Sequence, residues 1–173
     1  DHRDLHSFPT RRSSDLVYGA RGFVIAHRTN LWAFTSPVKG LTVWPTGGAW
    51  LCQHLWEHYR FTGDRDFLTA RGYPAMKEAA EFFLDWLVVD PRSGRLVSGP
   101  SISPENSYRL SDGRTASLDM GPAMDQQIIG ELFDNCLDAA NELGVRDAFV
   151  EAVAQARSRL AEPQIGPHGR LLE

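Results

Sequence analysis

Apolar residues recur at three- and four-residue spacing in four stretches of this chain, at 47–62, 73–89, 124–143 and 147–160. Each stretch predicts a helix with a single buried face. Only brief strand signal separates them, at 95–98. Successive helices joined by loops must bury their apolar faces against one another, so the pattern predicts an all-α fold.

Glycine, proline and aspartate mark the ends of the predicted helices. Gly63 and Gly144 follow the last apolar positions of two of them, where a left-handed residue closes a helix. Pro74 lies in the first turn of the second helix, where its missing N–H costs little. Asp64 can cap a short segment over 65–71.

Long loops interrupt the helical pattern twice. Residues 17–30 suggest a strand or an extended segment, and 31–45 form a loop that carries Trp32 and Trp44. The second loop begins at Gly99, contains the polar sequence SISPENS at 101–107 and is expected to be irregular over 108–120. A loop of this length inside a compact domain usually marks a functional site.

Glu105 is the candidate catalytic residue of the second loop. Asn106 and Tyr108 can donate hydrogen bonds to a carboxyl group or to a sugar. Aromatic rings stack on the apolar faces of sugars, so Trp32 and Trp44 suit a carbohydrate site, although packing under a loop is as common a role. On these residues Glu105 is a candidate general acid of a glycoside hydrolase, with a solvated loop glutamate as the alternative.

Composition and charge exclude other classes of function. The chain has 173 residues, the length of one domain, and a net charge of −4 without a basic stripe, so neither nucleic acid nor a membrane is expected as a partner. Cys52 and Cys136 fall on apolar helix faces and are expected to be buried thiols, with a disulfide or a metal site as the alternative. His54 and His58 suit a helix surface or a packing role better than a metal site.

Residues 1–16 show neither helical nor strand periodicity and resemble the translation of a sequencing-adapter oligonucleotide. We predict that this segment is a non-native, disordered tail, with a natural disordered arm as the alternative. The chain shows no apolar core of a signal peptide, and the natural N-terminus is expected to be missing. The compartment of the protein is therefore left open.

Four separated motifs stand out along the chain: residues 44–64 (WPTGGAWLCQHLWEHYRFTGD), 99–106 (GPSISPEN), 123–129 (AMDQQII) and 163–166 (PQIG). In this order they resemble segments of glycoside hydrolase family 95, the inverting α-L-fucosidases. The resemblance implies that residues 17–173 form part of an (α/α)6 barrel catalytic domain. It also implies hydrolysis of terminal α-L-fucosyl linkages with inversion, a fucosylated oligosaccharide or glycan as partner, and neither cofactor nor metal.

The resemblance also assigns roles to individual residues. Glu105 matches the general acid, and Asn30 matches a residue that positions the attacking water. The residues expected to bind substrate are His27, Arg28, Trp32, Trp44 and Asn106. An aspartate that assists the base is expected beyond Glu173, whereas Asp125 is expected to cap its helix or to form a salt bridge.

Departures from the family pattern leave the identity of the sugar open. Arg28 stands where the family has an asparagine and Ala26 where a histidine is common, so an α-L-galactosidase or another (α/α)6 glycosidase is the alternative. A non-catalytic helical binding or scaffold module is the second alternative. It would be favoured if Trp32, Trp44 and Glu105 lay on separate faces of the molecule. Because half of the acid–base pair is expected elsewhere, the isolated chain is predicted to be inactive.

Overall fold

The computed structural model describes residue 15 and residues 17–25 and 43–172, so the predicted tail over 1–16 lies almost wholly outside the described residues. The helical elements are α2 (Gly47–Thr62), α3 (Arg65–Phe67), a π-helical turn η1 (Leu68–Gly72), α4 (Tyr73–Trp86), α5 (Ala123–Leu143) and α6 (Ala148–Arg159). The strands are β1 (Val88–Val89), β2 (Leu96–Val97), β3 (Ser101–Ile102), β4 (Tyr108–Arg109), β5 (Thr115–Ala116) and β6 (Leu118–Asp119). The predicted all-α class with only short strands is therefore confirmed.

The helix ends follow the expected local chemistry. Gly63 closes α2 and Gly144 closes α5 in the left-handed conformation, at φ of 67° and 73°. The carboxylate of Asp64 accepts a hydrogen bond from the backbone N–H of Phe67 at 2.8 Å and so caps α3. The second predicted helix is three residues too long, because α4 ends at Trp86 and the valines that follow form β1.

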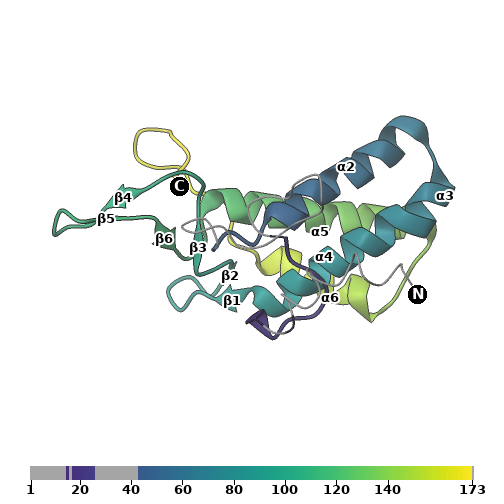
Figure 1. Cartoon of the computed structure of the whole chain (residues 1–173), viewed down its shortest axis with the longest axis horizontal. Helices are drawn as coiled ribbons and strands as arrows, with labels where there is room; N and C mark the ends of the chain where they lie inside the picture. Colours follow the sequence, from purple (N-terminus) through teal and green to yellow (C-terminus); the bar gives the residue numbers. More distant parts are fainter. Residues whose placement is uncertain (1–14, 16, 26–42, 173) are drawn as a thin grey trace.

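Helix α5 lies at the centre of the bundle, in contact with α2, α4 and α6 (Figure 1). Its buried side joins a core of large apolar side chains. The largest fully buried ones are Phe82, Phe83, Phe133, Leu68, Met76, Ile129, Leu132 and Val153. The strands gather at one end of this bundle, where α4 ends and α5 begins (Figure 1). The helices therefore form a scaffold that carries the loops at that end.

The cysteines and histidines on α2 and α5 have structural surroundings. Cys52 and Cys136 are buried free thiols, as predicted, and burial raises the pKa of Cys52 to about 12. His54 is exposed beside Glu57, with 3.4 Å between Nδ1 and Oε2, and the His58 ring lies 4.2 Å from that of Phe67. Within the described ranges, no group of three His, Cys, Asp or Glu residues is placed to hold a metal ion. Among the same residues, no helix is both long and apolar enough to cross a membrane.

The expectation of an irregular stretch over 108–120 is wrong. Strands β4 and β5 form an antiparallel hairpin, and β6 pairs with β3 so that Asp119 lies opposite Ser101. The hairpin projects beyond the helices (Figure 1). Its turn contains Asp112-Gly113, with Gly113 at a φ of 86°, and an Asp-Gly pair is a strong sequence signal for a hairpin. Strands of two residues are too short to show an alternation of apolar and polar residues. The Asp-Gly turn, in contrast, can be recognised in the sequence.

Candidate functional site

The loop that carries Glu105 leaves β2 through Ser98, a fully buried residue bound on several sides. The Ser98 N–H donates to Oε1 of Gln126 at 2.9 Å, and its carbonyl accepts from the Gly121 N–H at 2.6 Å. Its hydroxyl donates to Oδ2 of Asp125 at 2.8 Å and accepts from the indole N–H of Trp86 at 3.0 Å. The first turn of α5 therefore fixes the start of the loop.

Asp125 joins this segment to the residues that precede α2. Its side chain is 0% exposed, and its Oδ1 accepts hydrogen bonds from Nε1 of Trp44 at 3.0 Å and from Oγ1 of Thr46 at 3.2 Å. The hydroxyls of Ser98 and Ser101 also bind this carboxylate. We call this group, Asp125 with Trp44, Thr46, Ser98 and Ser101, the Asp125 network. It ties together three of the four sequence motifs.

The predicted capping or salt-bridge role of Asp125 is wrong. No side chain caps α5, which begins after Pro122, and all four partners of the carboxylate are neutral donors. Burial raises the pKa of Asp125, whereas the hydrogen bonds from Ser101, Ser98, Thr46 and Trp44 lower it in part. Asp125 therefore acts as a shared hydrogen-bond acceptor inside the core, which is neither of the predicted roles.

Gly99 lets the loop pass closely over the β6 segment. Its φ is 154°, and a Cβ atom there would lie 2.6 Å from Sδ of Met120 and 3.1 Å from the Met120 Cα. A side chain at this position would be strained by the backbone conformation and would force Met120 to move. The close contact with Met120 and the backbone conformation therefore explain why position 99 is a glycine.

Glu105 lies at the tip of the loop, in a turn closed by the Asn106 N–H, which donates to the Ser103 carbonyl at 2.6 Å. Ser103 is buried, whereas Glu105 and Asn106 are exposed. Among the described residues, none buries the Glu105 carboxyl group. The apolar or carboxylate-rich setting that a general acid needs therefore stays a prediction.

A cavity of about 480 Å³ opens between this turn and the β4–β5 hairpin. Glu105 and Pro104 are not in its wall, but Ser103 and Asn106, which flank them, are. The lining residues are Ser103, Asn106, Ser107, Tyr108, Ser117, Asp119, Met120, Gly121 and Pro122. The cavity combines hydroxyl, amide and carboxylate groups with the ring of Tyr108, which is a mixture suited to a polar organic ligand.

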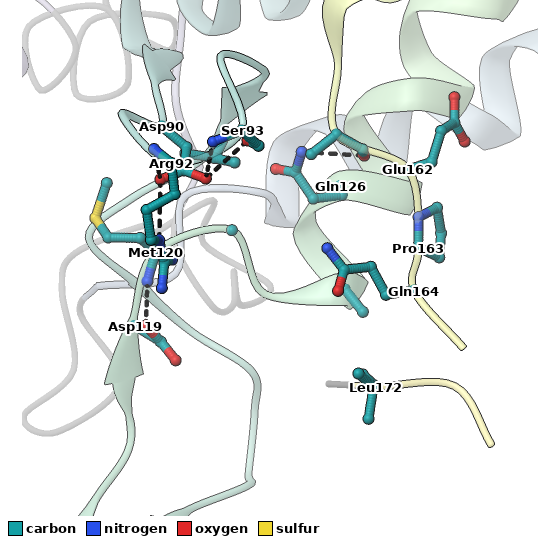
Figure 2. A pocket seen from close by; sticks show the side chains of 14 residues that line it. Asp90, Arg92, Ser93, Asp119, Met120, Gln126, Glu162, Pro163, Gln164 and Leu172 are labelled. Atoms are coloured by element: carbon teal, nitrogen blue, oxygen red, sulfur yellow. Dashed lines mark hydrogen bonds and ion pairs between the residues drawn. The ribbon is translucent and has the colours of Figure 1, made fainter. Parts of the chain in front are cut away.

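A second cavity, of about 280 Å³, shares Asp119, Met120 and Gly121 with the first. Figure 2 shows Asp119 and Met120 on one side of it, with Gln126 and Gln164 across from them. The Gln126 amide group donates to the Leu96 carbonyl at 3.1 Å. The Asp90 carboxylate accepts from the Ser93 hydroxyl at 2.7 Å. Side chains engaged in this way hold the loops together, which indicates a structural role for this cavity.

The predicted site residues are only partly within the described residues. His27, Arg28, Asn30 and Trp32 lie outside them, as does Ala26, and their roles stay predictions. Asn106 lines the larger cavity, next to Glu105. Among the predicted site residues that the structure describes, the cavity wall contains Asn106, whose sequence neighbour is Glu105.

Trp44 lies instead in the Asp125 network. It is 2% exposed, and its ring contacts that of Trp50 edge-on at 6.0 Å between centroids. This burial favours the packing role over sugar stacking for Trp44. Sequence reasoning also missed the network itself, although one signal was present: Asp125 occupies the same helix stripe as Ile128, Ile129 and Leu132. A polar residue on an apolar stripe indicates a buried polar contact.

Fold and site together define a class: a helical domain whose loops at one end hold a carboxylate-bearing turn beside a polar cavity. Residues 4–173 match the family model described as the glycosyl hydrolase family 95 catalytic domain, and the chain belongs to this family. Its helices are part of the catalytic domain of this family, and the (α/α)6 arrangement that the resemblance implies stays a prediction. The match begins inside the segment predicted to be a non-native tail, and that assignment stays a prediction.

Curated relatives agree with this family. The chain is 38% identical over 177 residues to "Alpha-L-fucosidase 2" of Arabidopsis thaliana, a match that covers 100% of the chain and 21% of the relative. It is 30% identical over 169 residues to "Probable alpha-fucosidase A" of Aspergillus niger, covering 93% of the chain and 21% of that relative. The chain therefore spans about a fifth of the length of the curated relatives that it matches.

Proposed function

We propose that the protein to which this chain belongs hydrolyses terminal α-L-fucosyl linkages of oligosaccharides with inversion, and that Glu105 is its general acid. Membership of the family and the names of both relatives support the reaction class. The observation that supports the role of Glu105 is the construction of its loop. The Asp125 network anchors the base of the loop, and the tip carries Glu105 at the edge of a cavity of about 480 Å³.

The chemistry requires two groups on opposite faces of the sugar, with carboxyl groups roughly 6.5–9.5 Å apart in inverting enzymes. Glu105 donates its proton to the glycosidic oxygen as the bond from that oxygen to the anomeric carbon breaks. A water molecule attacks the same carbon from the other face and gives its proton to the base. In this proposal Asn30 positions that water. His27, Arg28 and Trp32 contact the fucosyl unit.

A general acid must be protonated before it acts, and burial or a neighbouring carboxylate raises a carboxyl pKa for this purpose. Glu105 is exposed in its turn, so this environment must come from the bound glycan or from other parts of the protein. The buried base of the loop supplies position rather than proton affinity. Different groups therefore position the acid and keep it protonated.

Substitution of Glu105 in the full-length protein tests the proposal. Glu105→Gln should lower kcat/KM for a fucosylated oligosaccharide by about 10²–10⁴, the range for loss of a general acid. The variant should keep most of its activity on α-L-fucosyl fluoride, because fluoride leaves without a proton. Nuclear magnetic resonance of the first product should show inverted β-L-fucose. Equal losses on both substrates, or no loss on the oligosaccharide, would refute the role of Glu105.

The alternative sugar is α-L-galactose, and Ala26 is the observation that favours it. A small residue in place of the family's histidine leaves room for a larger substituent at C5 of the sugar. The rates of hydrolysis of aryl α-L-fucoside and aryl α-L-galactoside by the full-length protein decide between the two. If neither is cleaved, the non-catalytic helical module becomes the better hypothesis.

A further inference from the structure

The cavity of about 480 Å³ beside Glu105 has a wall made by a single part of the chain. The lining residues that the structure describes all fall within 103–122, on the loop that carries Glu105 and on the segment that returns to α5. Its volume falls within the range of roughly 300–1,000 Å³ that is usual for small-molecule sites. It is thus a ligand-sized space placed directly next to the proposed acid.

The wall of this cavity has a fixed position relative to the acid turn. Strand β6 pairs with β3, so Asp119 is held opposite Ser101 at the start of the Glu105 loop. Tyr108 follows the turn directly, and its hydroxyl donates to the Leu118 carbonyl at 2.8 Å. This bond ties β4 to β6 and fixes the position of the hydroxyl end of the Tyr108 side chain. The cavity wall and the backbone of the acid turn therefore form one unit.

The groups in the wall match the two faces of a saccharide. Tyr108 and Met120 are 40% and 43% exposed and offer apolar surface, on which the C–H face of a sugar ring can lie. Asn106, Ser107 and Ser117 offer amide and hydroxyl groups for sugar hydroxyls. The Asp119 carboxylate, oriented by the Met120 N–H at 2.8 Å, is a further acceptor.

We propose that this cavity is the leaving-group subsite, which binds the saccharide released from the fucosyl unit, with Tyr108 as its stacking platform. This inference rests on the proposed function. A general acid protonates the oxygen that departs with the leaving group, so the leaving group must lie on the side of the acid. Ser103 and Asn106 belong both to the turn that carries Glu105 and to the cavity wall, so the cavity borders the acid turn.

Tyr108→Ala in the full-length protein tests the subsite with two substrates. A fucosylated oligosaccharide has a saccharide leaving group, whereas α-L-fucosyl fluoride has none. Loss of one stacking ring should lower kcat/KM for the oligosaccharide about 10-fold, mainly through KM, and change the value for the fluoride less than about twofold. Tyr108→Phe keeps the ring and should restore most of the oligosaccharide activity.

Leu110→Ala is the matched control, because Leu110 is an exposed apolar residue of the same hairpin outside the cavity wall. It should leave both substrates unaffected. Equal losses on both substrates in Tyr108→Ala, or no loss on the oligosaccharide, would overturn the subsite. Failure of the unmodified protein to cleave either substrate would refute the proposed function itself, and with it the assignment of a leaving group.

Discussion

The base and the tip of the Glu105 loop differ in burial and in the hydrogen bonds that hold them. At the base, Ser98 and Ser101 are fully buried, and their hydroxyl groups bind the carboxylate of Asp125. At the tip, Glu105 and Asn106 are exposed and are held by a single turn. The base thus has one permitted arrangement, whereas the tip presents its side chains to a ligand. Position and reactivity are therefore supplied by different residues.

This division suits an acid that must meet a substrate atom within a few tenths of an ångström. A catalytic group is placed well when neighbouring packing and hydrogen bonds lock the backbone that carries it. Here the hydrogen bonds that hold the loop come from the first turn of α5, the helix that contacts α2, α4 and α6. The loop therefore takes its position from the centre of the helical core. The predictions below separate the base from the tip.

Asp125→Ala should have the largest effect on local stability. It leaves four buried donors without their acceptor, which costs about 3–5 kcal/mol. Hydrogen exchange in the full-length protein can follow the Ser98 N–H and the Gly121 N–H, which are bound within the base. Their protection should fall at least about 100-fold.

Asp138→Ala, an exposed residue on the same helix, is the control and should change this protection little. If Asp125→Ala matches the control, the base is not held by its carboxylate. Loss of protection at the tip but not at the base would also contradict the comparison.

Gly99→Ala should have an intermediate effect, because the new Cβ meets Met120 and the backbone adopts a φ of 154°. We expect a cost of about 2–3 kcal/mol in the same exchange measurement. Gly94→Ala is the control, since its φ of 70° is also positive but no atom lies within 4 Å of the added Cβ. That change should cost about 1 kcal/mol. Equal costs would show that the contact with Met120 is unimportant.

The sequence predicts most of the helical scaffold, because each helix carries its own periodic apolar stripe and its own end signals. Gly63, Gly144 and Asp64 act as expected, since caps depend on residues within one turn. The pairing of β3 with β6 was not predictable by periodicity, because strands of two residues do not alternate long enough.

The Asp125 network was missed for a different reason. The bond between Trp44 and Asp125 joins residues 81 positions apart, and no local pattern specifies such a partner. The position of Asp125 on an apolar stripe showed only that it would be buried. The environment of Glu105 depends in the same way on groups distant in sequence, so a motif identified the residue without describing its surroundings.

Asp85→Asn should have the smallest effect, because the Arg21–Asp85 pair is exposed to solvent and neither residue belongs to the Asp125 network. Arg21 donates to Asp85 through Nε and Nη2, each at 2.8 Å, and these bonds lower the pKa of Asp85 from its ordinary value of 3.8. A lowered folded-state pKa gives stability that is present above the unfolded pKa and lost as the pH falls through the folded one. Since the Arg21 side chain is 61% exposed, solvent screening limits the gain to about 1 kcal/mol or less.

The difference in urea midpoint between Asp85→Asn and the unmodified protein should therefore be small at pH 7 and vanish well below pH 3.8, where both side chains are neutral. Protection of the Ser98 N–H should not change at either pH, because the base of the loop does not depend on this surface pair. A change in this protection would mean that the stability of the Asp125 network depends on the surface pair. The contrast between a base held by hydrogen bonds and an exposed tip would then no longer explain how Glu105 is placed.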